Sequence, residues 1–388
     1  MKKGGSYKII YVYSCFTLKG GAERVITDKM NWLASHGHDV TFVTYEQGEH
    51  PLSYPLDPRV KHIDTETRFF VLDNKSIIPR LILKYKMKLL FFKKLQDIVD
   101  EICPNFVVCT TDFLPTCDII TKLKTSAKFV VESHTTKNDT LMYSIQESFA
   151  KRIFRKFKAW IQYKKVKNFD VLVTLTEGDA LEWKPLAKSV AVIPNPVTFF
   201  PITIPTKTIC KRIIAVGRLF PVKAFDKLID AFSRVSDECE GWRLDIFGDG
   251  PEKERLLEYI DFCRMNDRVF INSSTHMIYD EYLKSDFCVL SSRNEGFGLV
   301  LIEAMSCGIP CVSFRCKYGP EDIISDGEDG LLVEDGNVDE LAAKIKWMCN
   351  HDKERLKMGI FAREKSKLFR KDIIMEQWID LFDKLCIK

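Results

Sequence analysis

Short apolar runs, glycine-containing loops and helical runs alternate along this chain, and their order leaves few folds open to it. The run Lys8–Tyr13 predicts a buried strand, and a loop containing Gly20 and Gly21 follows it. Apolar residues then recur at helical spacing over residues 23–36, before a second strand-like run at Asp39–Thr44. A strand, a glycine loop, a helix and another strand in this order predict a parallel α/β sheet.

The alternation continues in two series that a proline-rich segment separates. The first series has further strand candidates at residues 106–110, 128–132 and 170–174. The second series has candidates at residues 212–216, 242–247, 269–271, 287–290 and 310–314. Residues 192–205 between them are rich in proline and poor in helix formers, as interdomain linkers are. A chain of 388 residues is long enough for the two α/β domains that this pattern predicts.

The composition is that of a soluble globular protein, with 46% hydrophobic and 29% charged residues. No uncharged apolar run approaches the roughly 20 residues of a transmembrane helix, and the N-terminus lacks the pattern of a signal peptide. The 13 cysteines include no Cys-x-x-Cys pair, which favours buried free thiols in a reducing compartment over a zinc site. We therefore expect a cytoplasmic protein, or one held at the inner face of the cell membrane.

Basic residues are concentrated in two stretches of the first half, residues 79–94 and 151–167. Both stretches mix Lys and Arg with Leu, Phe, Tyr and Trp at helical spacing, which is typical of helices that lie on an anionic membrane surface. The alternative is a helix that faces the core and has a solvated basic back. No nucleic-acid-binding motif accompanies the charge, so we do not expect nucleic acid as a partner.

The most informative motif is residues 291–310, where Glu295 and Glu303 flank a Gly-Phe-Gly turn that follows an apolar run. The order predicts a strand, a tight turn and a helix N-terminus, whose backbone N–H groups suit a phosphate or diphosphate. Carboxylates beside such an anion site make better sense as acceptors for ligand hydroxyls. A ligand that has both a diphosphate and many hydroxyls is a nucleotide sugar.

Two further loops of the second half follow predicted strands. One contains Gly217, Arg218 and Lys223, whose planar guanidinium and mobile ammonium both suit phosphate oxygens. The other is a Gly-Asp-Gly turn with Gly248 and Gly250. Taken alone, neither loop is specific for a ligand. The first can equally be a surface loop with two solvated cations, and the second can equally be an ordinary turn.

In combination, these motifs resemble glycosyltransferase family 4, whose members have the GT-B fold. The resemblance covers nearly all of the chain and is most specific at the Glu-x7-Glu segment. It implies a fold of two Rossmann-like α/β domains that face a central cleft. Residues 1–196 would form an acceptor-binding domain and residues 197–371 a donor-binding domain. The amphipathic C-terminal helix, about residues 372–388, would cross back to the first domain with Ile373, Trp378, Leu381, Phe382 and Leu385 on its apolar face.

The resemblance also implies roles for individual residues. Arg218 and Lys223 would bind the diphosphate, Glu303 the ribose hydroxyls and Glu295 the donor sugar. Fixed cations and dipoles that stabilise the leaving diphosphate would then be the main source of catalysis. The implied catalytic set is Glu295, Lys223, Arg218 and His134. The implied donor-binding set is Gly20, Gly21, Gly217, Arg218, Lys223, Gly248, Gly250, Glu295, Gly296, Phe297, Gly298, Leu299 and Glu303.

His134 follows the predicted strand at residues 128–132, at a place where the family often has a histidine near the donor sugar or the reacting centre. The alternative is a loop histidine bonded to backbone. The family usually has a glycine near position 273, where this chain has Ser273, so the contacts to the nucleotide base are open.

The resemblance implies a retaining glycosyltransferase that needs no metal and no cofactor, and the chain has no strict Asp-x-Asp motif. We expect transfer of a hexose or N-acetylhexosamine, most simply from a UDP-sugar, to a glycan that is lipid-linked, as in surface polysaccharide or lipopolysaccharide synthesis. The alternatives are a nucleotide-sugar epimerase on the same fold and a catalytically silent nucleotide-sugar-binding subunit of a glycan assembly complex. Loops of the first domain, residues 46–80 and 135–149, would select the acceptor.

Overall fold

The computed structural model describes residues 5–17, 20–72, 77–111, 118–135, 153, 157, 159–161, 163–204 and 209–387. These residues form two compact units, one of residues 1–193 with 375–388 and one of residues 194–374. None of the helices in the described residues combines the length and the hydropathy that a membrane span requires.

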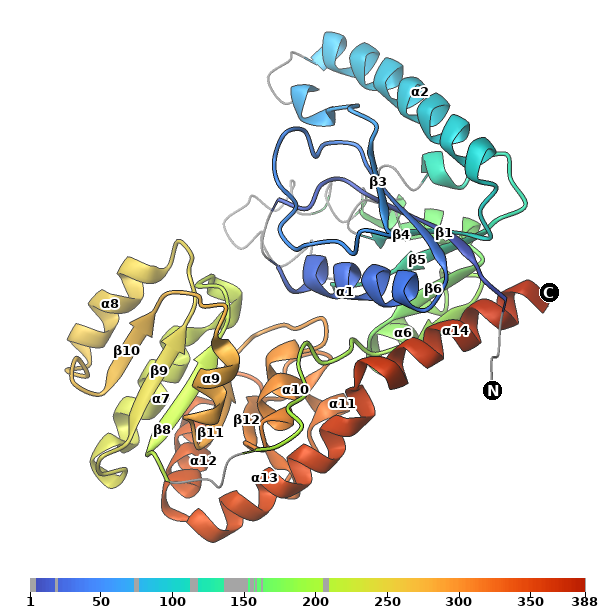
Figure 1. Cartoon of the computed structure of the whole chain (residues 1–388). Coiled ribbons are helices and arrows are strands. Elements are labelled where there is room, and N and C mark those ends of the chain that lie inside the picture. The colour runs from blue at the N-terminus through green and yellow to red at the C-terminus, as the bar shows by residue number, and fades with distance from the viewer. Residues whose placement is uncertain are drawn as a thin grey trace. The chain divides into compact units, whose positions relative to one another are not determined.

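The first unit is built on a parallel seven-stranded sheet, in the order β3-β2-β1-β4-β5-β6-β7 (Figure 1). Except for the edge strand at Lys61–Asp64, which is mostly polar, each strand is a short run rich in apolar residues, as expected where helices cover both faces of a parallel sheet. Its strands are β1 Lys8–Tyr13, β2 Asp39–Thr44, β3 Lys61–Asp64, β4 Phe106–Thr110, β5 Lys128–Glu132, β6 Val171–Thr174 and β7 Val190–Val192. Its helices are α1 Gly21–Ser35, α2 Ile77–Ile102, α6 Glu177–Trp183 and α14 Lys371–Ile387, with short 3-10 turns at Phe69–Leu72 and Lys164–Asn168.

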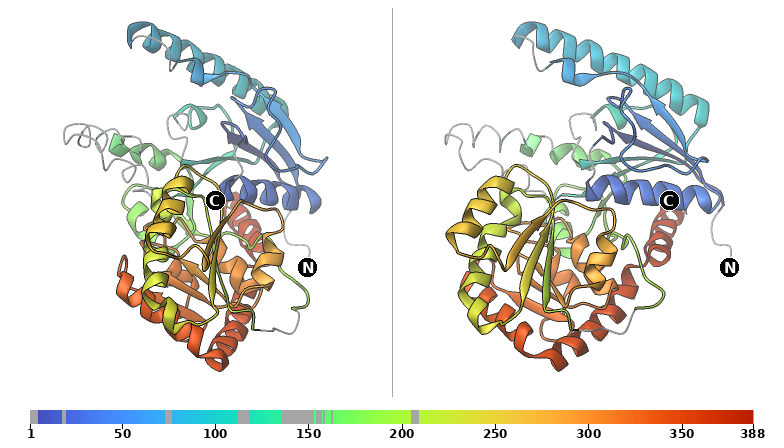
Figure 2. Two further views of the ribbon diagram at one scale, coloured as in Figure 1. Left: turned by 90° about the vertical axis from the view of Figure 1, so that its left-hand side faces the viewer. Right: turned by 60° about the vertical axis from the view of Figure 1, so that its left-hand side comes forward.

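Helices cover the two faces of this sheet from different parts of the chain. Alternate residues of β1 such as Ile10 and Val12 share a core with Phe91 and Leu95 of α2. Helices α1 and α14 lie on the opposite side of the sheet from α2 (Figures 1 and 2). The last helix of the chain therefore belongs to the first unit.

The second unit is built on a parallel six-stranded sheet, in the order β10-β9-β8-β11-β12-β13. Its strands are β8 Arg212–Val216, β9 Arg243–Phe247, β10 Val269–Asn272, β11 Phe287–Leu290, β12 Cys311–Phe314 and β13 Gly330–Val333. Its helices are α7 Phe225–Val235, α8 Lys253–Phe262, α9 Ile278–Leu283, α10 Leu299–Ser306, α11 Pro320–Ile323, α12 Val338–Asn350 and α13 Asp352–Ser366. Short 3-10 turns lie at Pro221–Lys223, Ser236–Glu238 and Lys367–Phe369.

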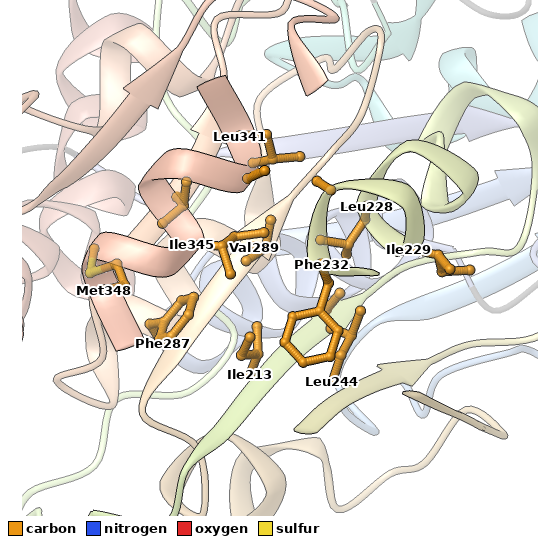
Figure 3. Packing of buried hydrophobic residues seen from close by; sticks show 14 of the residues in the cluster. Ile213, Leu228, Ile229, Phe232, Leu244, Phe287, Val289, Leu341, Ile345 and Met348 are labelled. Carbon is orange, nitrogen blue, oxygen red and sulfur yellow. The ribbon is translucent and has the colours of Figure 1, made fainter. Parts of the chain in front are cut away.

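One core of the second unit lies between the sheet and two helices. Figure 3 shows Phe232 of α7 and Ile345 of α12 packed against Ile213 of β8 and Phe287 of β11. The short parallel strands and their covering helices confirm the predicted α/β fold with two parallel sheets.

The C-terminal helix differs from its expected pattern at one residue. Ile373, expected on the apolar face, is exposed, while Ile374 and Met375 are buried beside Trp378 and Phe382 in the helical sequence. Positions 374, 378 and 382 follow each other at i,i+4, so they define a buried stripe to which Ile373 does not belong.

Packing of α14 on the first unit gives a stability prediction. The ring of Phe382 is fully buried and lies 4.3 Å from that of Phe106 in β4, centroid to centroid. Phe382→Ala should lower the free energy of unfolding by about 3–5 kcal/mol, because a buried ring is lost and a cavity remains. Ile387→Ala, at an exposed position of the same helix, is the control and should change it by less than about 0.5 kcal/mol. Urea unfolding measures both, and equal effects would contradict the packing role.

Candidate functional site

In each unit, some of the predicted site residues follow a strand at which the strand order reverses. In the second unit, β8 has β9 on one side and β11 on the other, so the chain leaves these strands in opposite directions across the sheet. In the first unit, β1 stands in the same relation to β2 and β4. Ligands of open parallel sheets bind at the carboxyl ends of strands at such a reversal.

Lys223 and Glu295 meet at the reversal in the second unit. Lys223 ends the 3-10 turn after β8, and Glu295 lies in the loop after β11. The Lys223 Nζ atom is 2.5 Å from Glu295 Oε1, and both side chains are partly exposed. Two further hydrogen bonds join these loops, each at 2.8 Å. Ser291 Oγ donates to the Lys223 carbonyl, and the Arg293 N–H donates to the Val222 carbonyl. This pairing holds a cation and a carboxylate side by side at the edge of the sheet.

Ala224, directly after Lys223, is a buried residue with a left-handed backbone, at φ +48°. This conformation costs a residue other than glycine about 1–3 kcal/mol and is kept where the surrounding structure requires it. Here it turns the chain from the 3-10 turn into α7, which begins at Phe225. The strained residue is therefore the one that links Lys223 to α7.

Glu303 is buried in α10 and is held at both carboxylate oxygens. Thr198 Oγ1 donates to its Oε1 at 2.5 Å, and the Tyr282 hydroxyl donates to its Oε2 at 3.3 Å. Burial, followed by the nearby Glu303 charge, raises the pKa of Tyr282 well above its usual value, so the phenol stays protonated and can donate. Neither partner was predicted. Thr198 follows the proline-rich segment and Tyr282 lies in α9, and no spacing pattern relates either residue to Glu303.

Three predicted glycines bring two loops of the second unit into backbone contact. The Gly217 N–H donates to the Phe247 carbonyl at 3.0 Å, and the Leu219 N–H donates to the Asp249 carbonyl at 2.9 Å. A Cβ atom on Gly248 would stand only 1.9 Å from the Gly217 carbonyl oxygen, so no side chain fits there. A Cβ atom on Gly250 would stand 2.4 Å from the Leu219 carbonyl oxygen, which is also too close. These glycines therefore pack the two turns against each other.

Gly296, Phe297 and Gly298 form the turn between β11 and α10, as predicted. Gly298 has φ +98°, a conformation that favours glycine, and Leu299 is the first residue of the helix. Phe297 is buried and its ring lies 5.7 Å from that of Phe369. The Gly-Phe-Gly turn therefore fixes the position of the α10 N-terminus at the edge of the sheet. The backbone N–H groups at this end of the helix have no partner within the helix.

Arg218 and the segment around Ser273 complete the predicted region of the second unit. Arg218 is exposed, and its guanidinium carbon lies 5.2 Å from the centroid of the Phe220 ring. The Ser274 N–H donates at 3.0 Å to the carboxylate of Asp249, so the loop after β10 is tied to the Gly-Asp-Gly turn. This contact joins the loops after β9 and β10.

In the first unit, Gly20 is the N-cap of α1 and Gly21 is its first residue. Residues 18 and 19 of the same loop lie outside the described residues. His134 follows β5 and is buried, with its Nε2 atom 2.8 Å from Glu132 Oε2. Glu132 also pairs with the buried Lys29 of α1. The histidine therefore contacts a carboxylate rather than backbone.

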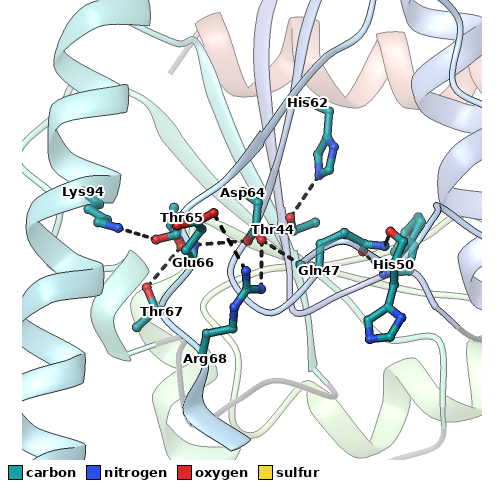
Figure 4. Close-up of polar contacts among 12 residues, drawn as sticks. Thr44, Gln47, His50, His62, Asp64, Thr65, Glu66, Thr67, Arg68 and Lys94 are labelled. Atoms are coloured by element: carbon teal, nitrogen blue, oxygen red, sulfur yellow. Dashed lines mark hydrogen bonds and ion pairs between the residues drawn. The ribbon is translucent and has the colours of Figure 1, made fainter. Parts of the chain in front are cut away.

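The loops after β2 and β3 are held together by Asp64 (Figure 4). Its carboxylate accepts from the Gly48 N–H at 2.9 Å and from Arg68 Nη1 at 3.0 Å. Burial raises the pKa of Asp64, but the bonds from Gly48, Glu66 and Arg68 outweigh it and lower that pKa. Lys94 of α2 donates to the Thr65 carbonyl at 2.6 Å. These contacts give residues 45–72 a defined conformation. The second expected acceptor loop, residues 135–149, lies almost wholly outside the described residues.

Across the described parts of the chain, no group of three or more His, Cys, Asp or Glu side chains is arranged to hold a metal ion. The site residues instead offer an ammonium, a guanidinium, two carboxylates and a helix N-terminus. Such a set can bind a phosphorylated, polyhydroxylated ligand through charge and hydrogen bonds.

Two protein-family models match the chain one after the other. A model described as Glycosyltransferase Family 4 matches residues 19–198, and a model described as Glycosyl transferases group 1 matches residues 204–365.

Among curated proteins, an uncharacterized glycosyltransferase of Haemophilus influenzae is 28% identical over 365 residues, which are 92% of this chain and 95% of that protein. The lipopolysaccharide 1,6-galactosyltransferase of Salmonella typhimurium is 32% identical over 167 residues, or 41% of this chain and 46% of that protein.

Among solved structures, a mutant of TarM from S. aureus in complex with Fondaparinux, alpha-GlcNAc-glycerol and UDP aligns with a TM-score of 0.77. It is 17% identical, and the alignment covers 97% of this chain and 99% of that chain. At this identity the likeness shows a common fold. With the family models on both halves and a relative matched over nearly its whole length, the chain belongs to glycosyltransferase family 4, a family of retaining glycosyltransferases.

Proposed function

We propose that this glycosyltransferase moves a hexose or an N-acetylhexosamine from a UDP-sugar to a lipid-linked glycan, in the assembly of a surface polysaccharide or lipopolysaccharide. The observation that carries the proposal is the pairing of Lys223 with Glu295 at the strand-order reversal of the second unit. The names of the similar proteins support the sugar class, because one is a galactosyltransferase of lipopolysaccharide and TarM was crystallised with UDP and alpha-GlcNAc-glycerol.

In this proposal, the second domain, residues 197–371, binds the donor. Lys223 and Arg218 neutralise the diphosphate, and the N–H groups of the first turn of α10 add to the field. Glu295 accepts hydrogen bonds from the donor sugar while it keeps Lys223 in place. Glu303, already oriented by Thr198 and Tyr282, accepts hydrogen bonds from the ribose hydroxyls.

The first domain, residues 1–196 with the C-terminal helix, receives the acceptor in this proposal. Gly20 and Gly21 allow its first loop to approach a phosphate closely. The segment of residues 45–72 that Asp64 holds in shape is one of the loops that select the acceptor. His134 then serves at the donor sugar or the reacting centre.

A lipid-linked acceptor is supported by the outer face of α2. Leu81, Tyr85 and Leu89 are exposed and follow each other at i,i+4, and the exposed Lys93 continues the same stripe. The buried residues of the helix, such as Phe91, lie on its other face. Apolar side chains next to lysines suit a surface of anionic lipid. The second basic stretch, residues 151–167, lies partly outside the described residues.

Removing the Lys223 ammonium should lower turnover. In Lys223→Ala, the leaving diphosphate loses a fixed cation, which should reduce transition-state stabilisation by about 2–4 kcal/mol. Transfer is measured as UDP release from a UDP-sugar in the presence of a lipid-linked acceptor. Lys346→Ala, which removes an exposed lysine paired with Glu238, is the matched control and should keep wild-type turnover. Wild-type turnover in Lys223→Ala would exclude the role, and donor conversion without any acceptor would favour an epimerase.

Removing the Glu303 carboxylate should weaken nucleotide binding. Glu303→Ala loses the acceptor of the ribose hydroxyls, which should cost about 1–3 kcal/mol of affinity for UDP. Titration calorimetry with UDP measures this without need of an acceptor. The control is Glu354→Ala, an exposed carboxylate on α13, which should bind UDP as the wild type does. Equal affinities in the two variants would contradict the assignment.

Membrane contact through α2 is tested with vesicles. The wild type should sediment with vesicles of anionic lipid at low salt and much less with zwitterionic vesicles, because the attraction is partly electrostatic. Leu81→Ser/Leu89→Ser should reduce this binding several-fold. Phe262→Ser/Ile360→Ser removes two exposed apolar residues of the second unit and should bind like the wild type. Wild-type binding by the α2 variant, or no binding by the wild type, would rule out this surface.

A further inference from the structure

A buried polar cluster in the first unit is built from residues far apart in the sequence. Lys29 lies on α1, Glu132 ends β5 and His134 follows it. Their side chains are only 2%, 3% and 2% exposed. The Lys29 ammonium and the His134 Nε2 atom contact the same carboxylate oxygen, Glu132 Oε2. Three ionisable groups are thus shielded from water and share one oxygen.

The charge of Glu132 determines which atoms donate. Burial raises the pKa of the Glu132 carboxyl, but Lys29 and His134 outweigh this effect and lower the pKa to about 2. At neutral pH the carboxylate is therefore ionised and can only accept hydrogen bonds. The His134 Nε2 atom must then carry the proton that it shares with Glu132. In a neutral imidazole this leaves Nδ1 with a lone pair and no proton.

The aromatic side chains around the cluster, Trp378 and Tyr11, do not form a hydrogen bond with the His134 Nδ1 atom. Trp378 of α14 lies against the Lys29 ammonium, with 4.1 Å from Nζ to the ring centroid, so Lys29 contacts a carboxylate and an aromatic face. Tyr11 of β1 is buried, and burial followed by the Glu132 charge raises its pKa. Among the described residues, His134 Nδ1, Glu132 Oε1 and the Tyr11 hydroxyl have no hydrogen-bond partner.

An ion pair that served stability alone would require only Lys29 and Glu132. The imidazole adds a third group to the same oxygen, and its far nitrogen is buried with no partner in the described part of the chain. Buried polar atoms without a hydrogen-bond partner are uncommon in folded proteins and require an explanation, such as a catalytic role or an ordered water.

We propose that Glu132 and Lys29 are positioning residues, which hold the His134 imidazole in the Nε2–H form so that Nδ1 accepts a hydrogen bond from a substrate hydroxyl. This inference rests on the proposed function for the presence of that hydroxyl. Lys29 keeps the carboxylate ionised, the carboxylate selects the tautomer, and the tautomer determines that His134 accepts rather than donates at its open nitrogen. Trp378 supports Lys29 from α14.

The tautomer is tested first in the unmodified full-length protein, without donor or acceptor. Nitrogen-15 NMR of the His134 ring at alkaline pH, where imidazole is neutral, should show a single Nε2–H tautomer. A His134→Asn variant assigns the signals. An Nδ1–H form, or a mixture of the two tautomers, would overturn the inference whatever the enzyme does in an activity assay.

The second test removes the positioning charges together, so that no single charge is left buried. In Lys29→Met/Glu132→Gln, the tautomer preference of His134 should be lost, and kcat for sugar transfer should fall about 10- to 100-fold, as is typical when an orienting partner is removed. The affinity for UDP should stay unchanged. Lys188→Met, which removes the exposed Lys188–Asp170 pair of the same unit, is the control and should keep the tautomer and kcat.

The possible results separate the two proposals. A folded double variant with the wild-type tautomer and wild-type kcat would show that Glu132 and Lys29 do not position His134. An enzyme that transfers no sugar to any acceptor would contradict the proposed function, while the NMR spectrum would still decide the tautomer. If the double variant does not fold, the spectrum of the wild type remains the deciding measurement.

Discussion

The parallel arrangement of both sheets is the constraint on which the rest of the structure depends. Parallel strands need a long crossover connection, usually a helix, that returns the chain to the same end of the sheet. Every loop that leaves a carboxyl end therefore lies at the same edge of its sheet. In the second unit this brings the loop after β8 beside the loop after β11, although some 70 residues separate Lys223 from Glu295 in the chain. The same rule places the carboxyl ends of β1 and β4 side by side in the first unit.

Within this frame, the chain uses charged side chains in two different ways. Lys223 and Glu295 are partly open to solvent, so a phosphorylated ligand can compete for the ammonium without exposing a buried charge. Lys29 and Glu132 are enclosed and have no such freedom, because separating them would leave a charge in an apolar environment. The Lys223–Glu295 pair is therefore suited to bind a ligand in place of its own contact. The Lys29–Glu132 pair is suited to fix the orientation of a neighbouring side chain.

The alternation of strands and helices and the positions of the motif residues could be predicted from the sequence. Strands such as β8 and β11 are continuous apolar runs, and the Gly-Phe-Gly turn indicated the start of α10. Strand β3 was missed because its residues Lys61–Asp64 are mostly polar, and the short β7 because its three residues adjoin the proline-rich segment. The partners of Glu303 could not be predicted either. Thr198 and Tyr282 contact Glu303 only because separate elements pack together, and such a contact produces no periodic pattern in the sequence.

The last helix has a consequence for how this protein can change over evolutionary time. The chain leaves the first unit near residue 193 and returns to it near residue 375, so the second unit is, topologically, an insertion. A single crossover in the linker between two related genes would pair the sheet of one parent with α14 of the other. Phe382 would then meet a foreign partner in place of Phe106. We expect substitutions in α14 to accompany those in residues 1–193 rather than those in the unit that directly precedes it. An intact second unit would have to be exchanged through two breakpoints.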